Sequence, residues 1–249
     1  GLKEPDDAYR DACAILAAEG NPPYAHAVVD ETQDFGPQAL RLIRALVPPG
    51  PNDLMFVGDG HQRIYAKNKA SMSSCGIDIR GRGKKLYLNY RTTEEIRREA
   101  VALLEDIEVD DLDGGSDEIS RYKSLLHGPR PDRIHGASME TIRDGIRDFI
   151  EQCLKDNRDT QVGVMAPTLK LRDQLAKQIR EAGYKVATLD HRERLSRKDA
   201  QIFAMTLHRA KGLEFDAVAI VVNRELDENL RKLVYVGMTR AKRAARLYH

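Results

Sequence analysis

The residues best suited to chemistry stand where a short apolar run ends in acids, within AHAVVDETQDF at residues 25–35. The run Ala27–Val29 indicates a buried strand, and Asp30, Glu31 and Asp34 follow it within one turn. An aspartate at a strand end can bind Mg²⁺, which prefers oxygen ligands and keeps several waters. The adjacent glutamate can orient or deprotonate an attacking water. A solvated strand end is the ordinary alternative, and this stretch alone does not distinguish the two.

Two further stretches place polar residues at the ends of predicted strands. In LMFVGDGHQRIY (54–65), Gln62 comes just past a strand end, where it could sense a γ-phosphate or position a water. In LYLNYRTTEEI (86–96), Tyr90 could stack on a base, and Arg91 could reach phosphate oxygens in the forked manner that arginine favours. The alternatives are a Gly-rich turn in the first stretch and a strand with a capped helix in the second.

The last part of the chain holds two more polar stretches. HRAKGLEF (208–215) connects two apolar runs and carries more specific polar residues than an ordinary loop needs. In LVYVGMTRAKRAARLYH (233–249), four cations crowd one segment: Arg240, Lys242, Arg243 and Arg246. A basic face is usually just solvated. Arg240, however, could neutralise charge on a transferring phosphoryl group as an arginine finger.

The elements that must position these residues alternate along the chain. Strands are expected at residues 25–30, 52–59, 84–90, 132–138, 161–167, 184–189, 203–207 and 216–222, with a short one near the C-terminus. Helices are expected at 37–47, 94–106, 139–156, 169–183 and from about Asn229. This alternation predicts an α/β fold with parallel sheets covered by helices. A change of pattern near residue 90 indicates two α/β units, of which the first has too few strands for a complete sheet.

Composition limits the class of protein. Lysine and arginine number 40 and aspartate and glutamate 39, so net charge argues neither for nor against a nucleic-acid partner. Three distant cysteines (Cys13, Cys75 and Cys153) form no metal or disulfide pattern, which indicates a reducing compartment such as the cytoplasm. No apolar run approaches the ~20 residues of a membrane span, so no membrane association is expected.

Together and in this order, the five stretches resemble the UvrD/Rep family of superfamily 1 DNA helicases. DETQD is similar to motif II of that family, VGDGHQRIY to motif III and LNYRTTEEI to motif IV; TLHRAKGLEF is similar to motif V and LVYVGMTRAKRA to motif VI. The resemblance implies two RecA-like domains of the P-loop NTPase class. A partial first domain would occupy residues 1–89 with motifs II and III, and a second domain residues 90–249 with motifs IV, V and VI.

The resemblance also implies ATP and Mg²⁺ as cofactors. Asp30 would bind Mg²⁺, and Glu31 would be the general base for the attack of water on ATP. Gln62 would couple the γ-phosphate to the DNA site. Two arginines of the second domain, Arg91 and Arg240, would contact the γ-phosphate.

The remaining implied roles concern the nucleoside and the DNA. Tyr90 would stack on adenine, Glu214 would lie near the ribose, and Gly212 would allow close approach of the backbone. Four side chains would face the DNA: Tyr65, Lys67, His208 and Lys211. The expected partner is single-stranded DNA or DNA with single-stranded tails.

The chain also departs from the family. No G-x-x-x-x-G-K-[ST] phosphate-binding loop is present, and the nearest candidate, at residues 81–85, precedes a strand instead of opening a helix. The chain has no tryptophan for base stacking after motif III, so DNA contact should be more electrostatic and more sensitive to salt. The insertion before motif V is reduced to about residues 191–200.

We therefore expect the C-terminal portion of an ATP-dependent DNA helicase or translocase, moving 3′ to 5′ by family analogy. The chain begins with Gly1, not Met, and the missing N-terminal part of the same polypeptide would supply the phosphate-binding loop. The chain alone should then be inactive. One alternative is a non-enzymatic module that binds DNA or protein. Another is a metal-dependent nuclease that uses Asp30, Glu31 and Asp34.

Overall fold

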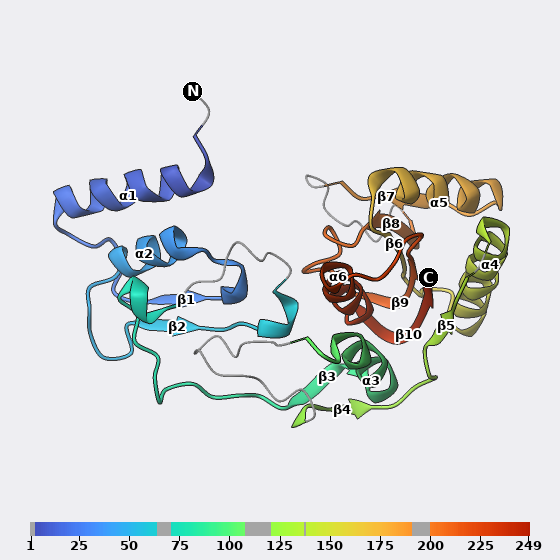
Figure 1. Ribbon diagram of the computed structural model, residues 1–249, viewed down its shortest axis with the longest axis horizontal. Helices are drawn as coiled ribbons and strands as arrows, with labels where there is room; N and C mark the ends of the chain where they lie inside the picture. The colour runs from blue at the N-terminus through green and yellow to red at the C-terminus, as the bar shows by residue number, and fades with distance from the viewer. Residues whose placement is uncertain (1–2, 64–70, 108–120, 137, 191–199) are drawn as a thin grey trace. The chain divides into compact units, whose positions relative to one another are not determined.

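The computed structural model describes residues 3–63, 71–107, 121–136, 138–190 and 200–249 (Figure 1). The described chain forms two compact units: unit 1 runs to Lys85 and unit 2 begins at Leu86. The boundary expected between residues 89 and 90 falls inside strand β3 (Leu88–Thr93), all of which belongs to unit 2. No helix in these ranges has the length and apolar character that crossing a bilayer requires.

Unit 1 is a small parallel α/β arrangement. Its elements are α1 (Pro5–Glu19), β1 (Ala27–Val29), η1 (Thr32–Asp34), α2 (Pro37–Ala45), β2 (Leu54–Phe56), η2 (Gly60–Gln62) and η4 (Ser73–Cys75). Strands β1 and β2 pair in parallel, with Val28 opposite Met55. The predicted strands in these regions are confirmed but are shorter than expected. Helix α1 was not predicted, and none of its residues is buried.

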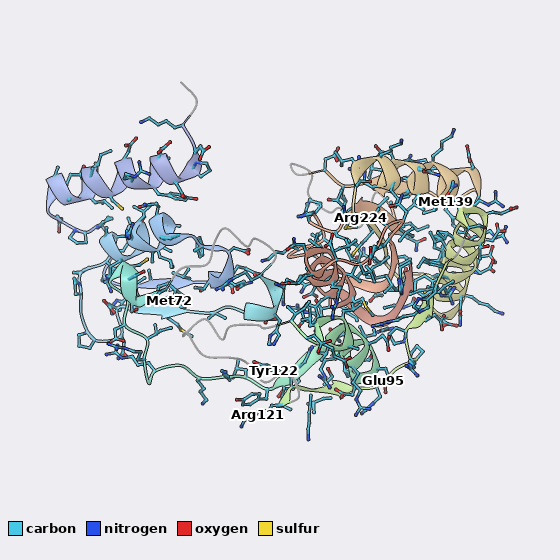
Figure 2. The ribbon with its side chains drawn as sticks, viewed as in Figure 1. Met72, Glu95, Arg121, Tyr122, Met139 and Arg224 are labelled. Carbon is cyan, nitrogen blue, oxygen red and sulfur yellow. The ribbon has the colours of Figure 1, made fainter. Side chains whose placement is uncertain are left out.

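The two faces of the β1–β2 sheet differ sharply. One face packs on α2 through a core built around Leu40 and Met72, the latter labelled in Figure 2. The other face carries Val28, Met55 and Val57, all of which are exposed; within the described residues we call it the uncovered face. Val28 is 75% exposed and Met55 is 59% exposed. Parallel sheets are normally covered on both faces, so apolar surface on this side is unusual.

Unit 2 contains the larger sheet. It comprises β3, α3 (Glu94–Val101), η5 (Ala102–Leu104), β4 (Lys123–Leu126), β5 (Asp132–Ile134), α4 (Met139–Asp156), β6 (Val162–Ala166), α5 (Leu169–Glu181), β7 (Val186–Thr188), β8 (Ile202–Thr206), β9 (Phe215–Val221), α6 (Glu228–Met238) and β10 (Ala241–Tyr248). Six parallel strands form one sheet in the order β5-β10-β9-β6-β8-β7, and β3 pairs in parallel with β4. The predicted parallel α/β fold is confirmed.

Helices cover both faces of the six-stranded sheet (Figure 1). On β9, Ala217 and Ala219 face the core shared with α4 and α5. The alternate residue Ile220 faces α6, where a Cβ on Gly237 would lie 3.0 Å from its Cδ1 atom. The same Cβ would lie 2.8 Å from Cδ2 of Leu207, so α6 approaches the sheet closely only because this residue is glycine.

The β3–α3 junction is held by side chains of motif IV. Thr93 caps α3 by accepting a hydrogen bond from the Ile96 amide at 3.4 Å. Buried Glu94 pairs with Arg97 at 2.6 Å and accepts the Ser124 amide of β4 at 2.8 Å. Arg97, the Ser124 amide and Arg98 outweigh the effect of burial and lower the pKa of Glu94 to about 2.

Strand β4 was not predicted from the sequence. It begins beside Arg121 and Tyr122, which Figure 2 labels. The Tyr122 ring meets Tyr87 edge to face at 5.3 Å between centroids, and the Arg121 guanidinium lies 4.7 Å from the Tyr87 centroid. These contacts hold the start of β4 against the segment that leads into β3.

Candidate functional site

The acids after β1 stand on an unusual backbone. Glu31 has φ 54° and ψ 37°, in the left-handed region that non-glycine residues rarely adopt. Its amide donates to Oδ1 of Asp30 at 2.8 Å, which fixes the Asp30 side chain relative to the backbone of Glu31. The Asp30 side chain is exposed at the carboxyl end of the strand. The backbone therefore turns abruptly at the point where sequence reasoning expects the metal ligand and the base.

Thr32 ties this turn to the second strand. Its hydroxyl donates to the Val57 carbonyl at 2.7 Å, and its amide donates to the same oxygen at 3.0 Å. The Val57 amide in turn donates to the Val29 carbonyl at 2.8 Å. Motifs II and III are thus joined where β1 and β2 end.

Gln33 makes the second link between the motifs. Its side chain is only 1% exposed. Nε2 donates to Oε2 of Glu31, and Oε1 accepts the Asp59 amide at 3.0 Å. Sequence reasoning missed this residue, although its position three residues after Asp30, within a stretch of acids, was a signal.

Asp59 holds the residues that follow it. Oδ1 accepts the His61 amide and ring Nδ1, both at 3.0 Å, and Oδ2 accepts Nε2 of Gln62 at 2.9 Å. Burial alone would raise the pKa of Asp59, but the bonds from His61 and Gln62 outweigh it and hold the pKa below its usual range. Unit 1 therefore brings Glu31 and Gln62 into one network through two residues that were not predicted to act.

Asp30 offers an exposed carboxylate that could hold Mg²⁺ only together with waters and the oxygens of a ligand. One carboxylate plus waters and phosphate oxygens is a common Mg²⁺ environment. In the part of the chain that the structure describes, no group of three or more His, Cys, Asp or Glu side chains could hold a metal by itself. Asp30, Glu31 and Asp34 thus do not form the acidic cluster that the nuclease alternative invokes.

In unit 2, the starts of β9 and β10 lie side by side. Phe215 is in register with Ala241, and its amide donates to the Arg240 carbonyl at 3.0 Å. Glu214 and Arg240, which immediately precede these strands, therefore share the amino edge of the sheet. Motifs V and VI, 26 positions apart at these two residues, meet there.

Glu214 joins three motifs. Its Oε1 pairs with Nε of Arg91 at 2.7 Å and its Oε2 with Nζ of Lys242 at 3.1 Å. Burial acts to raise the pKa of Glu214, but Lys242, Arg91 and Arg240 together lower it. The two predicted residues Arg91 and Glu214 are brought together, and Lys242 joins them.

Arg240 is almost fully buried. It is 3% exposed, and its guanidinium donates to the Val236 carbonyl at 3.1 Å and to the Thr239 hydroxyl at 3.2 Å. These bonds hold it against the last turn of α6. Its contact with a γ-phosphate stays a prediction.

Tyr90 and Arg91 project from a local irregularity in β3. Oδ1 of Asn89 accepts the Arg91 amide at 2.8 Å and the Thr92 amide at 3.3 Å, and the pairing with β4 shifts register between Asn89 and Thr93. Tyr90 is 69% exposed. An accessible ring is compatible with stacking on a base.

The turn after β8 carries the predicted DNA contacts of unit 2. His208 is exposed and Lys211 is half-buried, both between Thr206 and Gly212. Gly212 has φ 76° and open space around it, as a close backbone approach requires. The other two predicted contacts, Tyr65 and Lys67, lie outside the described residues.

Two helicase domain families each match one segment of the chain in sequence. The UvrD/REP helicase N-terminal domain matches residues 8–75, which include Asp30, Glu31 and Gln62. The UvrD-like helicase C-terminal domain matches residues 201–248, which include motifs V and VI. Over these two segments the chain is similar to UvrD/Rep-like helicases. The first segment contains the network of Glu31, Asp59 and Gln62, and the second contains Glu214 and Lys242. Of the residues in these two clusters, Arg91 lies outside both matched segments.

Two helicases among the solved structures are similar to this chain. The C-terminal domain of a possible DNA helicase from Lactobacillus plantarum WCFS1 is 21% identical with a TM-score of 0.48, over 64% of this chain and 86% of that one. The PRRSV helicase is 17% identical with a TM-score of 0.46, over 94% of this chain and 36% of that one. No curated protein matches. The similarity to UvrD/Rep-like helicases rests on the two sequence matches.

Proposed function

We propose that the complete protein containing this chain is an ATP-dependent DNA helicase or translocase that moves 3′ to 5′ along single-stranded DNA. The observation that carries the proposal is the network of unit 1. It connects a strand-end carboxylate pair to Gln62 through a continuous series of hydrogen bonds, three of them part-buried. A solvated strand end would need no such network.

The proposed reaction is the hydrolysis of ATP. Asp30 would hold Mg²⁺, which supplies charge neutralisation at the phosphates when bound. Glu31 takes a proton from water as the water oxygen bonds to the γ-phosphorus, and the bond from that phosphorus to the bridging oxygen breaks to release ADP. Gln62 senses the γ-phosphate and transmits its state to the DNA site.

Residues of unit 2 complete the proposal. Arg91 and Arg240 stabilise the charge of the transferring phosphoryl group, an effect worth about 10³–10⁵ in rate for an arginine finger. Tyr90 stacks on adenine, supported by its exposed ring. Glu214 lies near the ribose, and Gly212 lets the backbone approach the nucleotide.

The proposed DNA contacts are largely electrostatic. His208 and Lys211 face the strand from the turn after β8, and Tyr65 and Lys67 add to them. Phosphate contacts by cations make binding fall steeply with salt. Single-stranded DNA or duplexes with single-stranded tails are the proposed partners.

We further propose that another part of the same polypeptide covers the β1–β2 sheet and supplies the phosphate-binding loop. Exposed Val28 and Met55 on the uncovered face support a packing partner, because parallel sheets are normally buried on both sides. This chain alone would then not hydrolyse ATP. The three free cysteines, Cys13, Cys75 and Cys153, support a cytoplasmic location.

The test is ATP turnover by the complete protein with and without single-stranded DNA. We expect DNA to stimulate turnover and Glu31→Gln to lower kcat about 10²–10⁴-fold with KM for ATP changed less than about threefold. Glu181→Gln, on the exposed side of α5, is the matched control. A complete protein that binds DNA without turnover would favour the non-enzymatic alternative. Robust DNA-stimulated turnover by residues 1–249 alone would refute the claim that this chain is inactive.

A further inference from the structure

The buried side-chain amide of Gln33 has one donor group, Nε2, and one acceptor, Oε1, and each makes a hydrogen bond. Nε2 faces the Glu31 carboxylate and Oε1 faces the Asp59 amide. A backbone amide only donates, so the atom that faces Asp59 must be the oxygen. This fixes the side-chain orientation and leaves the donating NH₂ toward Glu31.

Neighbouring bonds hold Gln33 itself in place. Its carbonyl accepts Nε of Arg63 at 3.4 Å, and its neighbour Thr32 is bonded to the Val57 carbonyl. With the side chain 1% exposed, it has little freedom to turn away. Gln33 is therefore a rigid link between the turn after β1 and the loop after β2.

The link reaches Gln62 in two steps. The Asp59 amide is bonded to Gln33, and the Asp59 carboxylate holds Nε2 of Gln62 at 2.9 Å. A displacement of the Asp59 loop therefore moves the amide donor that faces Oε1 of Gln33, and Nε2 of Gln33 holds the Glu31 carboxylate. The arrangement couples the γ-phosphate sensor to the base within unit 1.

We propose that Gln33 is a positioning residue that sets the Glu31 carboxylate according to the state of the Asp59–Gln62 loop. The inference rests on the proposed ATP hydrolysis and adds the residue that orients the general base, Glu31. Gln33 touches neither water nor nucleotide in this role; it acts through Glu31. Bonding to both Glu31 and the Asp59 amide requires a side chain of this length with one donor and one acceptor. Glutamate and methionine at position 33 therefore cannot make both bonds.

The first experiment measures ATP turnover by the complete protein. Gln33→Met keeps the length but loses both bonds, and we expect kcat to fall about 10–100-fold with KM for ATP changed less than about threefold. Gln174→Met, exposed on α5, is the matched control.

A double substitution separates positioning from general damage. If Gln33 acts through the base, then Gln33→Met in a Glu31→Gln background should lower the residual rate less than about threefold. Hydrogen exchange on residues 1–249 supplies a readout that needs no activity. Gln33→Met should expose the Asp59 amide to exchange while the Val57 amide, bonded to the Val29 carbonyl, stays protected.

The outcomes distinguish this inference from the proposed function. An active wild-type protein whose Gln33→Met variant keeps kcat within about twofold overturns the inference alone. So does a further tenfold loss in the Glu31→Gln background. If Gln33→Met also loses protection at Val57, its loss of kcat comes from general damage to the β1–β2 region, and the inference is overturned. A complete wild-type protein without turnover overturns the proposed function and, with it, this role.

Discussion

Removing the charge of Glu94 should destabilise unit 2 at neutral pH and matter little in acid. Glu94 is buried between Arg97 and the Ser124 amide, and it links α3 to β4 next to the strand that carries Arg91. Glu94→Gln keeps the size and one acceptor but removes the charge. The variant therefore measures the ionic part of this junction.

The pKa gives the size of the effect. It is about 2 in the folded chain against an ordinary value of 4.5, which corresponds to about 3.4 kcal/mol at about 1.36 kcal/mol per pH unit. One partner, Arg98, is 75% exposed, so solvent screening reduces the expected loss to about 2–3 kcal/mol. Because the folded pKa is depressed, this stabilisation is complete above about pH 4.5 and disappears as pH falls towards 2.

The assay is urea unfolding followed by circular dichroism, with hydrogen exchange of α3 to assign the transition to unit 2. At pH 7 the variant should lose about 2–3 kcal/mol of unfolding free energy, and the deficit should shrink by roughly half at pH 3. Glu181→Gln, in an exposed pair with Lys177, should change stability by less than about 0.5 kcal/mol. An equal deficit at both pH values would refute the ionic explanation and point to packing instead.

Two further predictions concern packing and salt in unit 2. Gly237→Ala should lower the unfolding free energy measured in urea by about 1–3 kcal/mol, because the new Cβ would lie 2.8 Å from Leu207 Cδ2. The control Gly50→Ala, whose Cβ would have no neighbour within 4 Å, should change it little. Equal effects of the two substitutions would contradict the overpacking argument. Glu214→Gln should cost about 1 kcal/mol or less at low salt and still less in 1 M NaCl, since its pairs with Arg91 and Lys242 are partly exposed; a deficit that salt leaves unchanged would show that the pairs do not act through charge.

Sequence patterns predicted the regular elements wherever an apolar stripe is buried. The predicted helix 139–156 is α4 residue for residue, because Ile142, Ile146 and Phe149 mark its buried face. Helix α1 escaped prediction since it buries no residue, and β4 because its four residues carry little pattern. Strand order was beyond reach, because the pairing of β6 between β8 and β9 depends on contacts distant in sequence.

The candidate site was predicted as separate motifs but not as a network. Motif spacing pointed to Glu31, Gln62 and Arg91, yet nothing in their letters predicts which side chains bond to which. Gln33 looked like a spacer between acids, and its role follows only from a buried position between two strand ends. Burial and mutual orientation are properties of the folded backbone. The importance of a polar residue inside a motif is therefore the hardest feature to predict from sequence.

The left-handed backbone of Glu31 has an evolutionary consequence. Asn52 and Asp106 are the other described non-glycine residues with positive φ, and their types tolerate this conformation better than glutamate does. Such strain costs about 1–3 kcal/mol and persists only where the surroundings impose it. A glycine here would relieve it, so selection for stability alone would tend to erase the glutamate. In a distant homologue whose motif letters had drifted, a strained acidic residue at a strand end would still mark this place by its backbone.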